Sequence, residues 1–329
     1  MARQRTGKAA ASHYPSQINE ARDAQLLQVF SKPNSWVQSG VKPSPLRTTA
    51  RKRGRLSKAA GFFDAVPHEI LNMILLNLDY LSLAKLCTTN SKVAAYIKRQ
   101  PFYKLVVEYC HNTLRSMAML DLHRAHDARH VYKALVDPKC SAPGCKKLGN
   151  SLFLPNCRRS CLNCLGRTPI STALVLEAAI NKYGLSKMAI TENILCFKLP
   201  NLPEWFVVAA EAIDLATRLY GRRPVDSCLP LLWSEMATVP FPFLDPDSRR
   251  LEFGRQCRAC YMAYVEHRDI WTQIEIPPTD SDSKNWEMKL RDLEERGLAV
   301  FGIRTLLSHV RSGDCPEATV FWSQEIKRL

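Results

Sequence analysis

The twelve cysteines of this chain are the residues best placed to do chemistry. Thiols stay reduced in the cytosol and nucleus, where they act as buried packing groups, metal ligands or nucleophiles rather than as disulfides. Five of the twelve lie between residues 140 and 164, and two more form the C-x-x-C pair Cys257 and Cys260. Packing cysteines scattered through a core would not gather in this way, so the pattern favours metal binding.

The first group of cysteines has the spacing C-x4-C-x11-C-x3-C-x2-C. A C-x-x-C turn brings two thiolates to one zinc ion from one tight loop, and a second close pair completes a tetrahedral site. The predicted zinc ligands are Cys140, Cys145, Cys161 and Cys164, which leaves Cys157 as a spare thiol. Two alternatives stay open: unliganded buried thiols, or ligation by His126 and His130, spaced i, i+4 on a predicted helix.

A second group of ligands lies in the last quarter of the chain. Cys257-x-x-Cys260 and the distant His309-x5-Cys315 together form a Cys₃His set, which is typical of structural zinc sites. The segment between them is predicted to contain a charged helix at about residues 284–297, and the alternative is coincidental spacing. Four ligands leave no open coordination position, so the zinc, one or two ions in all, is expected to be structural.

The sequence carries none of the common catalytic signatures. It lacks the phosphate-binding G-x-x-x-x-G-K, the dinucleotide-binding G-x-G-x-x-G, the nucleophile elbow G-x-S-x-G and the metalloprotease motif H-E-x-x-H. It also shows no internal repeat of fixed period. We therefore expect a binding protein rather than an enzyme.

The elements that must position these ligands are predicted to be mainly helical. Between residues 62 and 105, apolar residues recur at helical spacing. Pro67 suits the first turn of a helix, and Glu69 suits its positive end. Asp79-Tyr80 ends this run, and Thr89–Ser91 is a cap signal for a later helix. We predict three short helices here, followed by an irregular helical region with structural zinc sites.

The segment resembles the F-box family, whose pattern runs from Leu-Pro through Glu-Ile, Ile-Leu, Leu-Asp and Leu-x-x-Leu to an aromatic residue. The chain has Val66 where Leu is usual and Phe102-Tyr103 where Trp is usual, and both changes keep apolar bulk. The resemblance implies docking on the Skp-type adaptor of a cullin-RING ubiquitin ligase, with an apolar helix face in a groove. It assigns adaptor binding to Val66, Pro67, Glu69, Ile70, Ile74, Leu75, Leu78, Leu83 and Leu86. The alternative is that these apolar positions only close the protein's own core.

The cysteine-rich block extends the resemblance to a group of fungal F-box proteins with such a block behind the F-box. The likeness covers about residues 62–220, including Trp205–Tyr220, which is predicted to be an amphipathic helix closed by Gly221. It implies a non-catalytic substrate-recognition subunit of an SCF-type (Skp–cullin–F-box) ligase, which presents a protein target for ubiquitination. The competing hypothesis is a zinc-dependent nucleic-acid-binding protein that uses the basic N-terminal tail.

The positive charge is concentrated near the N-terminus. The formal net charge is +15, and residues 1–60 hold 12 Lys or Arg against only Glu20 and Asp23, which gives 12 − 2 = +10. Few apolar residues accompany them, so we predict a mostly disordered basic tail at 1–60, an F-box at 61–105 and a cysteine-rich helical region at 106–329. The run Arg51–Arg55 indicates a nuclear-import or nucleic-acid contact, or only a solvated flank.

No window of the sequence has the roughly 18 consecutive apolar residues of a membrane span, and the N-terminus has no apolar leader. We therefore expect a soluble protein of the nucleus, the cytoplasm or both. Its expected partners are the Skp-type adaptor, through it a cullin, and an unidentified protein target. We expect no membrane partner and no nucleic-acid partner.

Overall fold

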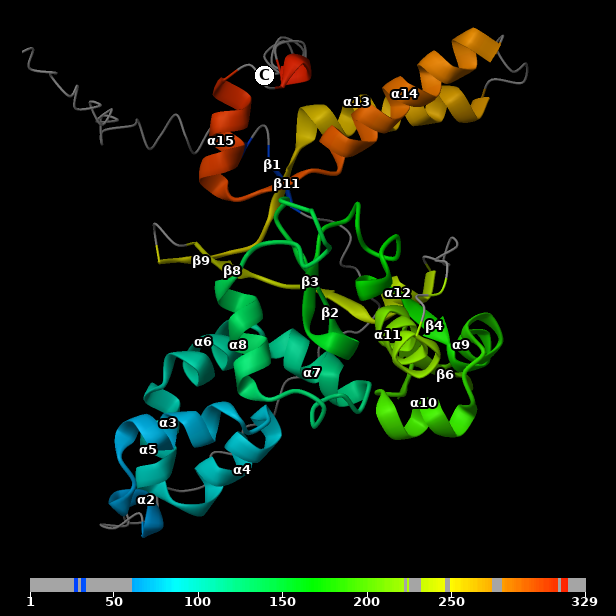
Figure 1. The fold of residues 1–329 in the computed structure, drawn as a ribbon. Coiled ribbons are helices and arrows are strands. Elements are labelled where there is room, and N and C mark those ends of the chain that lie inside the picture. Colours follow the sequence, from blue (N-terminus) through cyan, green and yellow to red (C-terminus); the bar gives the residue numbers. More distant parts are fainter. Residues whose placement is uncertain are drawn as a thin grey trace, which may run out of the picture.

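The computed structural model describes residues 27–28, 31–33, 61–221, 224, 232–245, 249–273, 280–312 and 315–318. In this part of the chain helices predominate, as predicted, and short antiparallel strands lie between them (Figure 1). The basic run at 51–55 lies outside the described residues. None of the described helices is both long enough and apolar enough to span a membrane.

Residues 61–109 form a group of short helices at one end of the molecule (Figure 1). In chain order these are α2 (Phe62–Ala65), α3 (His68–Leu76), α4 (Tyr80–Thr89), α5 (Ser91–Arg99) and α6 (Pro101–Tyr109). Caps confirm two predicted boundaries: the Asp79 side chain accepts a hydrogen bond from Ser82 N at 2.9 Å, and the Asn90 side chain accepts from amides two and three residues on. Pro67 is the N-cap residue of α3 rather than part of its first turn.

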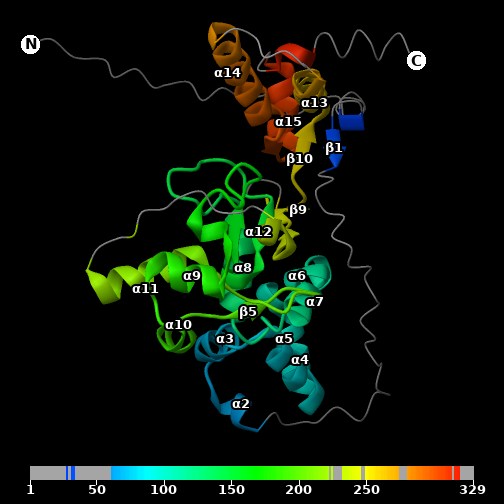
Figure 2. The ribbon, with the colours of Figure 1, turned by 90° about the vertical axis from the view of Figure 1, so that its right-hand side faces the viewer.

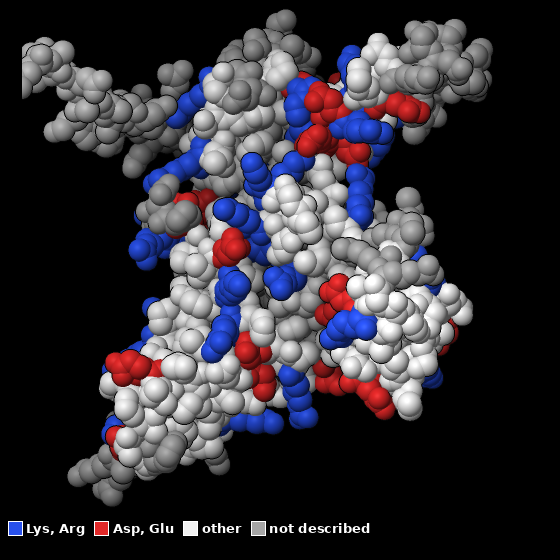
Figure 3. All heavy atoms as spheres, in the orientation of Figure 1, with Lys and Arg blue, Asp and Glu red and all other residues white. Residues whose placement is uncertain are grey.

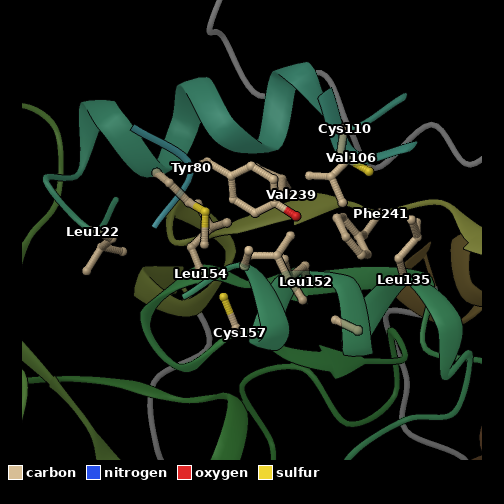
Figure 4. Packing of buried hydrophobic residues seen from close by; sticks show 14 of the residues in the cluster. Tyr80, Val106, Cys110, Leu122, Leu135, Leu152, Leu154, Cys157, Val239 and Phe241 are labelled. Atoms are coloured by element: carbon tan, nitrogen blue, oxygen red, sulfur yellow. The ribbon is translucent and has the colours of Figure 1, made fainter. Parts of the chain in front are cut away.

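The main hydrophobic core joins these helices to the cysteine-rich region without a break. Between the two lie α7 (His111–Met119) and α8 (Ala128–Val136). The core residues labelled in Figure 4 are Tyr80, Val106, Cys110, Leu122, Leu135, Leu152, Leu154, Cys157, Val239 and Phe241. The buried Tyr80 hydroxyl donates a hydrogen bond to the Phe102 carbonyl at 2.7 Å, which satisfies its polar end. The core therefore crosses the predicted boundary at residue 105.

Two small antiparallel sheets form the middle of the described chain, with strand orders β3-β2-β7 and β4-β6-β5. The strands are β2 (Ser151–Phe153), β3 (Arg158–Ser160), β4 (Ala173–Val175), β5 (Phe197–Lys198), β6 (Trp205–Val208) and β7 (Thr238–Pro240). Packed beside them are α9 (Leu176–Tyr183), α11 (Ala209–Tyr220) and α12 (Leu232–Met236), and α10 (Lys187–Asn193) packs against α11. The 3₁₀ turns η1 (Leu154–Asn156) and η2 (Pro169–Ser171) connect the strands.

The segment Trp205–Tyr220 is a strand followed by a helix, which corrects the prediction of a single helix. Phe206, Val207 and Val208 lie in the central strand of their sheet and are fully buried, a setting that favours aromatic and β-branched residues. The predicted end of the helix is confirmed, because Gly221 caps α11 in the left-handed conformation with φ of 73°.

The C-terminal region contains another three-stranded sheet, with the order β1-β10-β11. Figure 2 shows β1 beside β10. Its strands are β1 (Ser31–Pro33), β10 (Arg255–Cys257) and β11 (Val300–Phe301), and a nearby hairpin is formed by β8 (Phe243–Leu244) and β9 (Leu251–Glu252). The helices are α13 (Arg258–Gln273), α14 (Asp280–Gly297) and α15 (Ile303–Arg311). The predicted charged helix at 284–297 is confirmed as the larger part of α14.

A short piece of the N-terminal tail pairs with a distant strand. Ser31 to Pro33 pair antiparallel with Cys257 to Arg255, so β1 becomes an outer strand of the C-terminal sheet. These three residues therefore depart from the disorder predicted for most of residues 1–60. The partner strand lies more than 200 residues away, and such a pairing leaves no local signal in the sequence.

Candidate metal centres and an exposed apolar face

The first candidate metal centre lies where the loop 138–149 meets the end of β3. Backbone hydrogen bonds donated by Cys140 N at 2.9 Å and Gly149 N at 2.8 Å close this loop into a tight hairpin. Cys161 directly follows β3, and Cys164 N donates to the Cys161 carbonyl at 3.1 Å in the next turn. Local hydrogen bonds thus hold each pair of cysteines in a compact loop.

All four thiols predicted for this centre converge. Their sulfur atoms lie within 4.8 Å of one another, and Cys145 Sγ is 3.9 Å from Cys161 Sγ. Sulfur atoms that surround one zinc ion at about 2.3 Å are about 3.8 Å apart in a tetrahedron. The set Cys140, Cys145, Cys161 and Cys164 is therefore confirmed as a cluster that fits a metal ion.

The thiols of this centre shift one another's protonation. A hydrogen bond from the Cys161 thiol lowers the pKa of Cys140 to about 5, although burial opposes the shift. The same bond raises the pKa of Cys161, and burial raises the pKa of Cys164 to about 12. The thiolate of Cys140 is therefore favoured even without a cation. Deprotonation of the Cys161 and Cys164 thiols needs a positive charge among the sulfur atoms, which a metal ion would supply.

The second candidate metal centre joins three separate elements. Cys257 ends β10, Cys260 lies in the first turn of α13, His309 lies near the end of α15, and Cys315 follows that helix. Cys260 Sγ lies 3.3 Å from Cys315 Sγ and 3.4 Å from His309 Nε2, and all four ligand atoms lie within 4.8 Å of one another. Phe301 stacks on the imidazole with 4.7 Å between ring centroids and so fixes its plane. This predicted cluster is also confirmed as fitting a metal ion.

Protonation in the second centre follows the same pattern. Hydrogen bonds from the thiols of Cys260 and Cys315 hold the pKa of Cys257 well below its usual range. The bond to Cys257 in turn raises the pKa of Cys260 and raises that of Cys315 to about 12. All three cysteines are buried, so a bound cation would be the charge that stabilises their thiolates.

Glu317 lies beside the ligands of the second centre, and the spacing argument missed it. Its Oε2 lies 3.8 Å from Cys260 Sγ and 3.9 Å from Cys315 Sγ. Its other oxygen, Oε1, accepts a hydrogen bond from Arg296 Nη1 at 2.7 Å, which links the centre to α14. The sequence signal that could have identified Glu317 is its position two residues after the predicted ligand Cys315. Such outer groups orient and tune the ligands of metal sites.

The alternative ligands of the first centre lie elsewhere. Cys157 is buried in the main core (Figure 4), where burial raises the pKa of its thiol. His126 packs edge-on against His130 with 6.2 Å between ring centroids, and His130 Nδ1 lies 2.7 Å from Asp127 Oδ1. Among the described residues, the first cluster therefore consists of the four predicted cysteines without these three residues.

Arg159, in β3, is a buried cation that the sequence did not reveal. Its side chain is 2% exposed, and its guanidinium donates hydrogen bonds to four backbone carbonyls, those of Ala134, Gly149, Phe241 and Pro242. It also lies 5.0 Å from the centroid of the Phe241 ring. Burial lowers its pKa to about 9, which leaves it charged at neutral pH. Arg159 thus ties α8, the loop of the first centre and the chain after β7 together.

Gly149→Ala is expected to disturb the first centre. A Cβ atom there would lie 2.7 Å from Arg159 Cβ and 3.2 Å from Cys140 Cα, both in buried residues. We expect the unfolding free energy to fall by about 1–3 kcal/mol, measured by urea titration, and the metal to be lost more readily to a chelator. Gly144→Ala is the comparison, because nothing lies within 4 Å of its Cβ position and only its φ of +75° opposes the change. Equal metal retention in the two variants would contradict the steric argument.

The residues assigned to adaptor binding differ in burial. Ile70 and Ile74 are 48% and 40% exposed, whereas Leu75 and Leu83 are only 1% and 0% exposed. Leu75 and Leu83 are therefore core residues, which corrects their assignment to a partner surface. Pro67 and Glu69 are also exposed, and partly buried against the core are Val66, Leu78 and Leu86.

A continuous apolar face covers the outside of α3. Met73, which was not among the assigned residues, is 57% exposed and lies on the same side as Ile70 and Ile74 because the three are spaced i, i+3, i+4. Leu81, at the start of α4, is 39% exposed. The helical spacing of Met73 was the signal that could have added it. We call Ile70, Met73 and Ile74 the α3 face.

Comparison with known proteins finds no match: no family model, curated protein or solved structure matches the chain. The resemblance to the F-box family therefore stays a prediction. The function is argued below from the α3 face and the two candidate metal centres.

Proposed function

We propose that this chain is a non-catalytic substrate-recognition subunit of an SCF-type ubiquitin ligase. Its N-terminal helices would bind the Skp-type adaptor, and its metal-bearing region would present the target. The ubiquitin-transfer chemistry would belong to the partners. The observation that carries the proposal is the α3 face, an apolar surface that the protein's own core leaves uncovered.

Buried side chains on the inner side of α3 hold the α3 face in position. Leu71 and Leu75, on the opposite side of α3, and Leu83 of α4 belong to the main core. The helix therefore holds its position through its inner side and leaves its outer side available. Helix-in-groove recognition uses anchors spaced i, i+3, i+4, and each apolar side chain buried by a partner contributes about 1.5–3 kcal/mol.

The arrangement of the molecule supports two binding events at once. The helices α2–α5 lie at one end, and α13, α14 and α15, with the second metal centre, lie at the other (Figure 1). A partner on α3 would leave the metal-bearing end open to a target. In this proposal both metal ions are zinc, and their complete ligand sets make them structural supports for the recognition end.

Ile70→Asp and Ile74→Asp are expected to abolish adaptor binding while the protein stays folded. Each places a carboxylate in the centre of the α3 face, where burial against a partner would leave the charge unpaired. We expect affinity for a purified Skp-type adaptor to fall by at least about 30-fold, the effect of losing a central anchor. Calorimetry or pull-down measures it. The exposed α3 positions are better test sites than Leu78, which packs against the core.

Ile270→Asp is the matched control, because Ile270 is 50% exposed on α13, far from α3 along the chain. It should leave adaptor binding unchanged. Equal binding by the Ile70→Asp and Ile270→Asp variants would overturn the adaptor proposal. Absence of adaptor binding by the wild type, together with affinity for DNA or RNA that falls steeply with salt and is lost when residues 51–55 are neutralised, would favour the nucleic-acid hypothesis.

A further inference from the structure

A pocket of about 680 Å³ lies between the two candidate metal centres. Its walls come from the loop 138–149, from β11 with the start of α15, and from the β8–β9 hairpin. Each centre contributes a ligand residue to the lining, Cys161 from the first and His309 from the second. Each centre therefore contributes to the wall of this pocket, which we call the junction pocket.

The junction pocket has more basic than acidic side chains. The basic residues are Lys139, Lys146, Lys147 and Arg304, of which Lys147 is paired with Glu295 at 2.5 Å, and the acidic ones are Asp245 and Glu252. Among the described residues, the side chains of Lys139 and Lys146 contact no carboxylate, and Glu252 Oε2 already accepts a hydrogen bond from Ile303 N at 3.0 Å. Figure 3 shows Lys and Arg side chains gathered over the middle of the face that it draws. The pocket therefore suits an anionic ligand.

One wall of the junction pocket is the edge of a β-sheet. β11 pairs with β10 on one side, and among the described residues no strand pairs with its other side. The four residues Leu298–Phe301 all line the pocket. Backbone groups at a sheet edge can pair with an extended peptide, a recurring form of peptide recognition.

We propose that the junction pocket binds an extended acidic peptide, which adds as a strand beside β11 and directs carboxylates toward Lys139 and Lys146. The volume of the pocket lies within the range of small-ligand sites. Alternate side chains of a bound strand face the same way, so acidic residues at every second position would meet the lysines. The inference rests on the proposed function in one respect, because the peptide would be a segment of the target presented for ubiquitination.

The chemistry of the pocket favours a peptide over a nucleic acid. Of its aromatic residues, Phe243 is 4% exposed, and the imidazole of His309 already covers one face of the Phe301 ring, so the pocket does not hold the row of open aromatic faces that stacks bases. Apolar side chains such as Leu148 and Ile303 suit the side chains that alternate with the acidic ones.

A labelled peptide of about eight residues that alternates Glu with Thr tests the proposal, because β-branched residues favour the extended form. The full-length, metal-loaded protein should bind it saturably by fluorescence anisotropy. Replacing every Glu with Gln should weaken binding through loss of charge. N-methylating the internal amides should weaken it through loss of backbone donors, with the charge unchanged.

The variant Lys139→Glu/Lys146→Glu should bind the peptide at least about tenfold more weakly than the wild type. The matched control is Lys98→Glu/Lys187→Glu, which has the same change in charge at two exposed lysines on α5 and α10 and should bind normally. Equal weakening in both variants, no effect of N-methylation, or no binding by the wild type would overturn the proposal. The pocket would instead be assigned to nucleic acid if the wild type bound a single-stranded RNA but no peptide, and if only the Lys139→Glu/Lys146→Glu variant lost that RNA binding.

Adaptor binding separates this inference from the proposed function. Lys139→Glu/Lys146→Glu should bind the Skp-type adaptor as well as the wild type, because Lys139 and Lys146 lie outside the α3 face. Loss of peptide binding with adaptor binding intact is the expected result. A wild type that binds the peptide but no adaptor would overturn the proposed function and leave the pocket as a peptide site. A wild type that binds the adaptor but not the peptide would overturn the peptide-site proposal and leave the proposed function standing.

Discussion

Replacing Cys161 and Cys164 with serine should remove one of the two zinc ions proposed for this chain and unfold the region at residues 140–220. A structural zinc site contributes on the order of 10 kcal/mol of apparent folding free energy at neutral pH. Whole domains are stable by about 5–15 kcal/mol, so the loss is comparable to the total. The region should therefore lose its structure rather than merely become weaker.

Elemental analysis and hydrogen exchange measure this result. The wild type should contain two zinc ions per chain and the variant one, with amide exchange fastest in the region of the first centre. Cys87→Ser/Cys196→Ser is the matched control, because both thiols are half-buried and belong to neither cluster. It should keep both ions. A well-folded wild type without bound metal would contradict the zinc assignment.

Arg159→Met is expected to cost about 3 kcal/mol or more of unfolding free energy. The substitution leaves four carbonyl groups without their donor in the interior, and the backbone cannot be replaced to compensate. Removing the desolvated charge offsets part of this cost, because the guanidinium has no buried carboxylate partner among the described residues. We expect the free-energy cost of four unsatisfied carbonyls to exceed the gain from removing the buried charge.

Urea unfolding of the metal-loaded protein measures the effect of Arg159→Met. Arg158→Met is the matched control: the residue is adjacent and exposed, so its loss should change stability by less than about 0.5 kcal/mol. Arg159→Lys should fall between the two, because a single ammonium cannot reproduce the planar fork of donors. Equal stability of the Arg158→Met and Arg159→Met variants would show that the carbonyls find other donors.

Both candidate metal centres were predictable from local spacing. A C-x-x-C turn places two thiolates on one short loop whatever the rest of the fold does, and His309-x5-Cys315 works in the same way at the end of α15. The helix caps at Asp79 and Asn90 were equally local, because each side chain bonds to backbone within three residues. Each cap and each ligand pair joins residues that lie close together in the sequence, so it needs no knowledge of the fold, whereas the meeting of Cys260 with His309 and Cys315 does.

Only the tertiary structure decided which residues are covered. Leu75 and Ile74 are neighbours with the same character, yet one is buried and the other exposed, because the core lies on one side of α3. Cys157 is a core residue, Trp205–Val208 is a strand, and Arg159 binds carbonyls up to 83 residues away. The junction pocket exists only where three distant segments meet. Burial depends on neighbours that arrive from elsewhere in the chain, so spacing along the sequence determined the ligand sets and packing determined the surfaces.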